Sequence, residues 1–209
     1  IDSYTPPFYR GKALPLVQAK IRVSAIPETQ LIAPSDSPNL VYYWDKNYKR
    51  DTNASGFGKH SFTFETDPFV SEERITVTSN DRRENSFATN TIIIPFRSFE
   101  AKILFYKINE LGRTMINKSL NSNGIIKGET VKLSFHPLFL STTEQNFIDL
   151  FVNWSLNNQS MPPQDFAKQD QLYISSGGQS GSTPIELKLE GVEKLLQQVS
   201  GKINIFFQN

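Results

Sequence analysis

Apolar and polar residues alternate along most of this chain, and the alternating segments recur at a constant offset of 110 residues, as from Ile21 to Val131. The clearest match aligns Leu40-x-Tyr42-x-Trp44 with Leu150-x-Val152-x-Trp154. A period of two is typical of β-strands with one buried face, because successive strand side chains point to opposite sides. The pattern therefore predicts an all-β protein built as a tandem repeat.

The repeat divides the 209 residues into two expected domains, 1–98 and 99–209. About 100 residues are enough to bury an independent core. The Pro-rich residues 1–18 are predicted to be the leading edge strand of the first domain, since proline forbids helix there. Further strands of the first domain are expected at 20–26, around Trp44, and at 61–66, 74–79 and 89–96, with a hairpin-like loop at 46–58 and polar loops at 27–39 and 80–85.

The second copy departs from the first in two places. Residues 175–182 are rich in Gly and Ser, which predicts a flexible loop. Residues 191–200 have helical apolar spacing. This allows one or two helical turns that cap the sandwich, a helix that docks a partner, or a long connection whose Leu195 and Leu196 plug the edge of the core. Residues 95–99, between the copies, contain no glycine, so we expect a short and fairly rigid junction.

Trp44 and Trp154 are expected at the centres of the two domains. A wide ring on the third strand spans the gap of roughly 10 Å between the two sheets of an Ig-type sandwich. The chain contains no cysteine, so disulfides, thiolate metal sites and cysteine nucleophiles are excluded. Aliphatic pairs must replace the disulfide of such a core, and we predict Val23 with Val77 and Leu133 with Leu187.

The order of these strands resembles that of bacterial Ig-like and PKD-type β-sandwiches. The first copy shows it as the Tyr-x-Trp strand, Phe62-x-Phe64, and Ile75-Thr-Val-Thr followed by a turn and Thr91-Ile-Ile-Ile94. The opening segment 4–15 is also similar to the start of surface-type proteins of candidate-phyla bacteria. The resemblance implies two tandem antiparallel sandwiches, an extracellular or cell-surface location, and a role as a spacer or interaction module. The Gly-Asp-Gly turn of PKD domains is replaced here by Asp45-Lys46-Asn47.

Charge and hydropathy exclude two classes of partner. The chain has 22 basic and 21 acidic residues and a formal net charge of +1, with no block of one sign. Nucleic-acid binding draws on a clustered basic face, so no nucleic-acid partner is expected. No apolar run approaches the roughly 20 residues of a spanning helix, so we expect no membrane span in this segment.

Candidate chemistry is sparse, and we assign no catalytic, cofactor-binding or metal-binding residue. The two histidines, His60 and His136, occupy non-equivalent positions of the repeat and are interpreted as structural. Asp51, Asn53 and Ser55 match the first half of a calcium loop, but position 12 is not the required Glu, so weak calcium binding stays open. We therefore expect no enzymatic activity.

The leading hypothesis is a structural, adhesive or assembly segment of a bacterial surface structure, with a filament or pilus component as one version. Protein partners or self-assembly would use sheet edges, and the arm 1–15 is the best candidate for such contact. Phe8 and Tyr9 of this arm are expected to pack on a sandwich edge. The alternatives are a carbohydrate-binding module, with Tyr43 or Phe151 as the exposed ring, or accessory spacer domains of a larger secreted enzyme.

Overall fold

The structure is a computed structural model that describes residues 1–27, 38–81, 86–96, 99–120, 123–127, 130–142, 147–161 and 170–208. The expected fold class of tandem β-sandwiches is confirmed, in two compact units. The described strand pairs are antiparallel as expected except in unit 2, where Asn123–Lys127 pairs parallel to Gln198–Gln208. Unit 1 is Val17–Phe99 together with Ile1, and unit 2 is Asp2–Leu16 together with Glu100–Asn209. The loops expected at 27–39 and 80–85 and the junction at 95–99 fall partly outside the described residues, and the rigidity of the junction stays a prediction.

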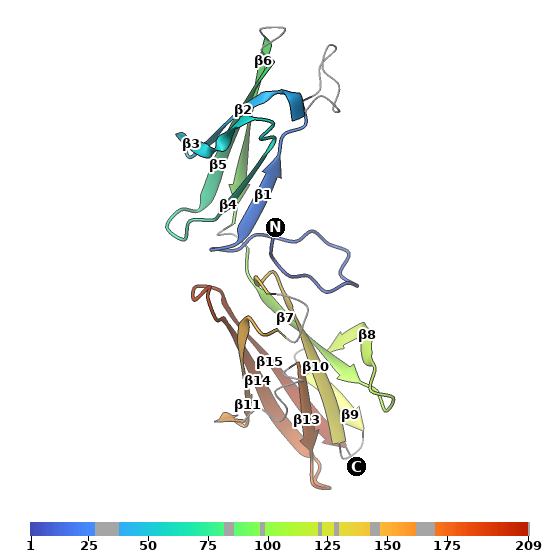
Figure 1. Cartoon of the computed structure of the whole chain (residues 1–209). Coiled ribbons are helices and arrows are strands. Elements are labelled where there is room, and N and C mark those ends of the chain that lie inside the picture. The colour runs from blue at the N-terminus through green and yellow to red at the C-terminus, as the bar shows by residue number, and fades with distance from the viewer. Residues whose placement is uncertain are drawn as a thin grey trace. The chain divides into compact units, whose positions relative to one another are not determined.

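Unit 1 consists of a sheet of two strands facing a sheet of four (Figure 1). The small sheet pairs β1 (Lys20–Ser24) with β4 (Ser61–Glu65). The large sheet has the order β3-β2-β5-β6. Its strands are β2 (Val41–Lys46), β3 (Lys49–Phe57), β5 (Glu72–Asp81) and β6 (Ser86–Pro95).

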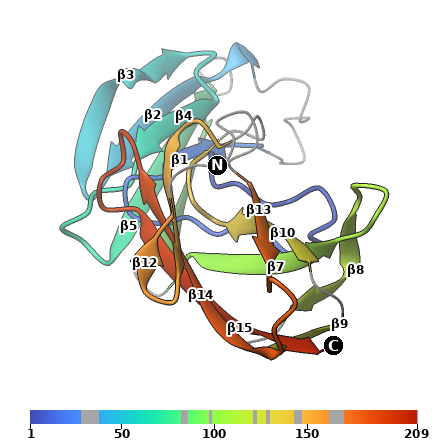
Figure 2. The same cartoon turned by 90° about the horizontal axis from the view of Figure 1, so that it is seen from below.

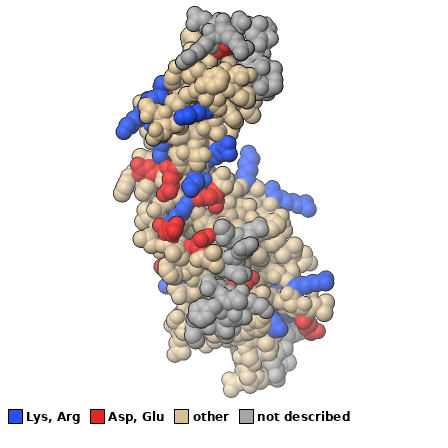
Figure 3. Space-filling view, in the orientation of Figure 1, with Lys and Arg blue, Asp and Glu red and all other residues tan. Residues whose placement is uncertain are grey.

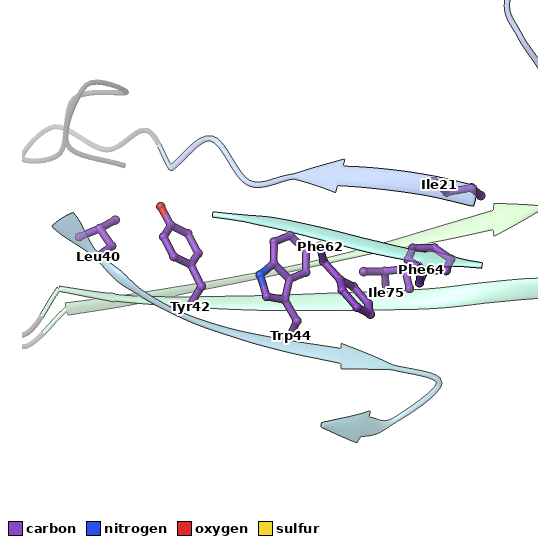
Figure 4. Packing of buried hydrophobic residues seen from close by; sticks show 7 residues of the cluster. All are labelled: Ile21, Leu40, Tyr42, Trp44, Phe62, Phe64 and Ile75. Carbon is purple, nitrogen blue, oxygen red and sulfur yellow. The ribbon is translucent and has the colours of Figure 1, made fainter. Parts of the chain in front are cut away.

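The core of unit 1 forms around Trp44, as the spacing predicts (Figure 4). The Trp44 side chain is fully buried, and its ring lies 5.8 Å from the ring of Phe62 on β4. The indole Nε1 donates a hydrogen bond of 2.9 Å to the carbonyl oxygen of Lys59, which satisfies the one polar atom of the ring. Ile75 on β5 completes the contact between the two sheets.

Unit 2 repeats this architecture with additional strands. One sheet has the order β13-β10-β7-β8 and the other the order β12-β11-β14-β15-β9. Figure 2 shows β14 beside β15 and β7 beside β10. The strands are β7 (Lys102–Ile108), β8 (Thr114–Leu120), β9 (Asn123–Lys127), β10 (Thr130–Leu138), β11 (Leu150–Leu156), β12 (Gln159–Ser160), β13 (Gln171–Ser175), β14 (Gly181–Gly191) and β15 (Gln198–Gln208).

The core of unit 2 is centred on Trp154, whose ring lies 5.7 Å from Phe135 and 6.1 Å from Phe105. Leu133 and Leu187, the aliphatic pair expected in place of a disulfide, are both fully buried. Phe105 comes from β7 and Phe135 from its neighbour β10. The neighbouring strands β7 and β10 therefore each contribute a ring that packs against Trp154.

The pairing registers of the two units confirm the 110-residue repeat. Trp44 pairs with Val77 in unit 1, and Trp154 pairs with Leu187 in unit 2. The other sheets agree, because Val23 pairs with Phe62 and the equivalent Leu133 pairs with Leu172. The two copies therefore share their strand order and also the alignment of individual residues.

The expected loop at 46–58 is wrong, because most of it is strand β3. The chain reverses in a two-residue turn at Asn47 and Tyr48, whose φ angles are 50° and 68°. Positive φ at both positions is the geometry of a type I′ hairpin turn, and asparagine tolerates it. The equivalent Asn157 and Asn158 have φ angles of 50° and 64°. Residues of β3 are polar because the strand is an exposed sheet edge.

The N-terminal arm, Asp2–Leu16, is not the leading strand of the first sandwich, since it belongs to unit 2. The backbone of Tyr4 exchanges two hydrogen bonds with unit 2, donating to Leu140 O at 2.8 Å and accepting from Phe139 N at 2.7 Å. The carboxylate of Asp2 forms an ion pair of 2.6 Å with Lys194. These contacts hold the arm on the second sandwich, so the first unit begins at Val17 apart from Ile1.

None of the interpretations of residues 191–200 is correct. Strand β14 continues to Gly191 and β15 begins at Gln198, so a short turn takes the place of a helix. Leu195 and Leu196 are 73% and 55% exposed, so they do not plug the core. The buried residue of this turn is Gln197, whose side chain bonds Ser141. The helical spacing of apolar residues arises by chance, because the segment joins the end of β14 to an exposed turn.

Candidate functional site

Unit 1 contains an open groove between β1 and β6, with a volume of about 360 Å³. Trp44 and Ile75 lie at its floor, where they join the core. The walls come from both sheets, with Val23, Ala25 and Pro27 on one side and Val77, Asn90 and Ile92 on the other. We call this feature the β1–β6 groove.

The same place in unit 2 is filled by a strand. β10 is the repeat equivalent of β1, and in unit 2 its second edge pairs with β7. In this pairing Phe105 lies opposite Phe135 and Ile103 lies opposite Pro137. The repeat equivalents of Phe135 and Pro137 in unit 1 are Ala25 and Pro27, which line the groove. Among the described residues of unit 1, β1 pairs with β4 alone.

Equivalent residues of the two units differ in exposure at this place. Ile203 on β15 pairs with Ile185 and is 3% exposed, whereas Ile92 on β6 pairs with the equivalent Ile75 and is 41% exposed. The pair Leu133 and Leu187 is fully buried in unit 2, whereas Val23 and Val77 are half-buried. The groove therefore exposes positions that are core in the sister domain.

The described lining of the groove contains few polar groups. Its lining is aliphatic and aromatic with a few hydroxyl and amide groups, among them Ser79, Thr89 and Asn90. None of the described residues that line it is an acid, a histidine, a lysine or an arginine. Charges lie elsewhere, and on the face of the molecule in Figure 3 the described basic and acidic side chains are interspersed.

The calcium-loop candidates Asp51, Asn53 and Ser55 lie on β3, at a β-bulge where the pairing with β2 shifts register. The Asp51 carboxylate accepts a hydrogen bond of 2.8 Å from the Ala54 amide. The Ser55 hydroxyl donates to the Asp51 carbonyl at 2.6 Å and accepts from the Trp44 amide at 2.9 Å. The residues that match the calcium-loop pattern therefore form an irregular strand instead of a loop. Within the described ranges, no group of three or more His, Cys, Asp or Glu side chains could hold a metal ion.

The two histidines occupy non-equivalent positions of the repeat and have different surroundings. His60 Nδ1 lies 3.0 Å from the carbonyl oxygen of Gly58. His136 pairs with Leu104 and its ring meets Phe8 and Tyr106 edge-on, at 5.2 and 5.7 Å. Burial lowers the pKa of His136 from its ordinary value and raises that of Tyr106. Phe8 was expected on a sandwich edge, but it packs on unit 2 against β10 and β7, the two inner strands of their sheet. Tyr9 also packs on unit 2, where its ring lies 6.0 Å from that of Phe139.

The two aromatic residues considered for glycan binding differ in exposure. The Arg50 guanidinium lies 5.0 Å from the centre of the Tyr43 ring and covers it. Phe151 is 54% exposed on β11 and pairs with Glu190. A single exposed ring is normal on a protein surface. No helix in the described part of the chain has the length and hydropathy needed to cross a bilayer.

The chain is similar in structure to several proteins of known structure. Three N-terminal domains of the bacteriophage RB49 highly immunogenic outer capsid protein match 93% of this chain, with 14% identity and a TM-score of 0.46. The chain spans 56% of the length of that structure. Fibronectin(III)-like modules of Clostridium thermocellum CbhA match 95% of this chain and are covered to 92%, with 10% identity and a TM-score of 0.31.

A third similar structure is the Bacteroides ovatus mixed-linkage glucan utilization protein SGBP-B in complex with a heptasaccharide. It matches 99% of this chain and is covered to 46%, with 9% identity and a TM-score of 0.26. No protein-family model matches the chain, and a search of curated proteins found no match. Both units are β-sandwiches, as the strand order of their sheets shows.

Proposed function

We propose that this protein is a non-enzymatic, extracellular component of a bacterial surface assembly, in which unit 1 binds another protein through the β1–β6 groove. The observation that carries the proposal is the groove itself, an apolar channel at positions that are core in unit 2. Contiguous exposed apolar surface marks interaction sites in proteins. The described lining presents hydroxyl and amide groups beside its apolar side chains, which suits a binding role.

The N-terminal arm, which was expected to make intermolecular contacts, is a weaker candidate than the groove for the surface that binds another protein. Tyr4 is 8% exposed and its ring meets Phe147 at 5.4 Å, edge-on. Ser3 forms a bridge with Ser141, so the arm's backbone is already used within unit 2. We therefore place the contact with other proteins on unit 1. A filament or pilus component remains one specific version of the proposal.

A photo-crosslinking experiment on intact cells tests this function. Benzoylphenylalanine replaces Ile92, whose side chain lines the groove, or Ile93, which is 51% exposed and follows it on the opposite face of β6. We expect an adduct with another polypeptide from position 92 and little or none from position 93, in cells labelled without lysis. Equal adducts from both positions, or labelling only after lysis, would contradict the proposal.

Carbohydrate binding is the second candidate, and Phe151 is the observation that favours it. An exposed aromatic ring on a sheet face can stack against a sugar. If the protein is a glycan-binding module, Phe151→Ala should weaken binding to an oligosaccharide array without changing the melting temperature. Exposed Tyr173, on β13 of the other sheet, provides the matched control Tyr173→Ala.

A further inference from the structure

We propose that the β1–β6 groove accepts an extended strand from another polypeptide chain, which runs antiparallel to β1 and carries large apolar side chains at alternate positions. This inference rests on the proposed function and specifies the geometry of its binding site. The occupant is defined by the sister domain, where β7 takes the same place beside β10. A strand added to an open sheet edge gains main-chain hydrogen bonds, and its alternate side chains fill pockets.

The orientation of the backbone groups of β1 supports strand addition. The Ala25 amide donates to the carbonyl of His60 at 2.8 Å, and the equivalent Phe135 amide donates to Asp170 at 3.2 Å. Neighbouring residues of a strand direct their amides to opposite edges. The amides of Ser24 and Ile26 therefore point to the edge that β4 does not use. In unit 2 the equivalent Ser134 pairs with Tyr106 of β7.

The side chains of the groove define the pattern of the occupant. By analogy with β7, one apolar residue lies opposite Ala25, a second lies opposite Pro27, and the residue between them faces away from the core. Ala25 is small where unit 2 has Phe135, so the residue opposite Ala25 has room for a ring as large as that of Phe105. The occupant also covers Asn90 and Ile92 on β6. In unit 2 the position equivalent to Asn90 is Gly201, which lies against Ile103 and Phe105 of β7.

The chain's own arm does not fit this description. Pro6, Pro7 and Pro15 cannot donate ladder hydrogen bonds, and the arm lacks the alternating apolar pattern of Ile103 and Phe105. Its backbone at Ser3 and Tyr4 is moreover paired with unit 2. A strand from another chain is thus a better occupant than the exchange of this arm between two copies.

A synthetic peptide with the sequence of residues 101–109, which contains β7, is the probe for this inference. Binding to the full chain is measured by fluorescence anisotropy of the labelled peptide. We expect saturable binding that Ile92→Glu weakens about tenfold or more, because a charge replaces an apolar contact. Ile93→Glu, on the opposite face of β6, should leave the affinity within about twofold of the wild type. Circular dichroism checks that both variants are folded.

A disulfide experiment tests the polarity and register directly, because the chain has no cysteine of its own. Leu133, the equivalent of Val23, pairs with Lys107. The full chain carrying Val23→Cys should therefore cross-link, in a glutathione redox buffer, to a peptide carrying Lys107→Cys. A peptide carrying Ile103→Cys, which reports the reverse polarity, should cross-link poorly.

Three outcomes would overturn the inference. They are the absence of peptide binding, equal effects of Ile92→Glu and Ile93→Glu, and preferred cross-linking at peptide position 103. The proposed function fails separately, in the cell experiment. If position 92 forms an adduct on intact cells but the peptide does not bind, the proposal of a protein partner stands and the proposal of an added strand fails. Peptide binding without an adduct would keep the strand geometry and reject the cellular role.

Discussion

Gly201 on β15 lies directly against the ring of Phe105 on β7. A Cβ atom added at position 201 would stand 2.9 Å from Phe105 Cε2 and 3.1 Å from Ile103 Cβ, closer than side chains normally approach. The strand that fills the groove of unit 2 therefore depends on a glycine beneath it. In unit 1 the equivalent position on β6 is Asn90, which lines the open groove.

The first prediction concerns this close approach. Gly201→Ala should destabilise unit 2 by about 1–3 kcal/mol, because the added methyl group forces β7 and β15 apart. Gly181→Ala is the matched control, since this glycine lies on β14 and a Cβ there would meet no atom within 4 Å. Differential scanning calorimetry of the full chain measures both. An equal effect of the two substitutions would contradict the packing described for Phe105.

Much of the fold could be predicted because the repeat fixes the alternation of buried residues. Trp44 and Trp154 marked the two centres, and the strands carrying them were expected with their inward faces. Strand β3 was missed because its edge position leaves it polar, so no apolar alternation distinguishes it from a loop. The turn at 191–197 was misread because apolar spacing alone does not reveal that Leu195 and Leu196 are exposed.

The groove was missed for a different reason. The 110-residue offset aligns the arm with residues 112–126 of the second copy and not with β7, so the repeat gives no indication of what lies beside β1. The place of the arm on unit 2 depends on long-range contacts such as the hydrogen bond between Tyr4 and Leu140, which the alternation of residues does not reveal.

The second prediction concerns the hairpin turn of unit 2. Asn158 has a φ of 64°, a conformation that glycine adopts without steric cost. Asn158→Gly creates the favoured Asn-Gly type I′ sequence and should stabilise unit 2 by about 0.5–1 kcal/mol. Asn158→Ala should do the opposite, since alanine gains nothing at positive φ. Urea denaturation compares the three proteins, and a more stable alanine variant would refute the turn assignment.

The third prediction concerns the buried carboxylate of Glu73, which is 0% exposed. It accepts hydrogen bonds from Asn47 Nδ2 at 2.5 Å and Asp67 N at 2.9 Å, and forms an ion pair of 3.0 Å with Lys46. Glu73→Ala leaves these donors without their acceptor and should cost about 3–5 kcal/mol. The exposed neighbour Glu72 is the control, and Glu72→Ala should change stability by less than about 0.5 kcal/mol. A small effect of Glu73→Ala in urea denaturation would show that the network is dispensable.

The fourth prediction concerns pH. Burial among Phe8 and Tyr106 lowers the pKa of His136 below its ordinary value of 6.5, so the folded chain binds this proton less readily than the unfolded chain. Above about pH 6.5 the group has no effect on stability, and as the pH falls below that value stability is progressively lost until the folded pKa is passed. His136→Gln and His136→Phe should both flatten the pH dependence of unfolding between about pH 7 and 5. An unchanged slope in both variants would contradict the assignment.

Amide hydrogen exchange at Ser24 and Ser134 is the most direct test of the central claim, that the second edge of β1 is open in the described part of unit 1 whereas β7 covers the equivalent edge in unit 2. These residues are repeat equivalents, and Ser134 is paired with β7. We expect the Ser24 amide to exchange orders of magnitude faster than the Ser134 amide in the full chain, and to become protected when the peptide of residues 101–109 is added. Equal protection of the two amides in the protein alone would show that the edge of β1 is already occupied, and would contradict the account.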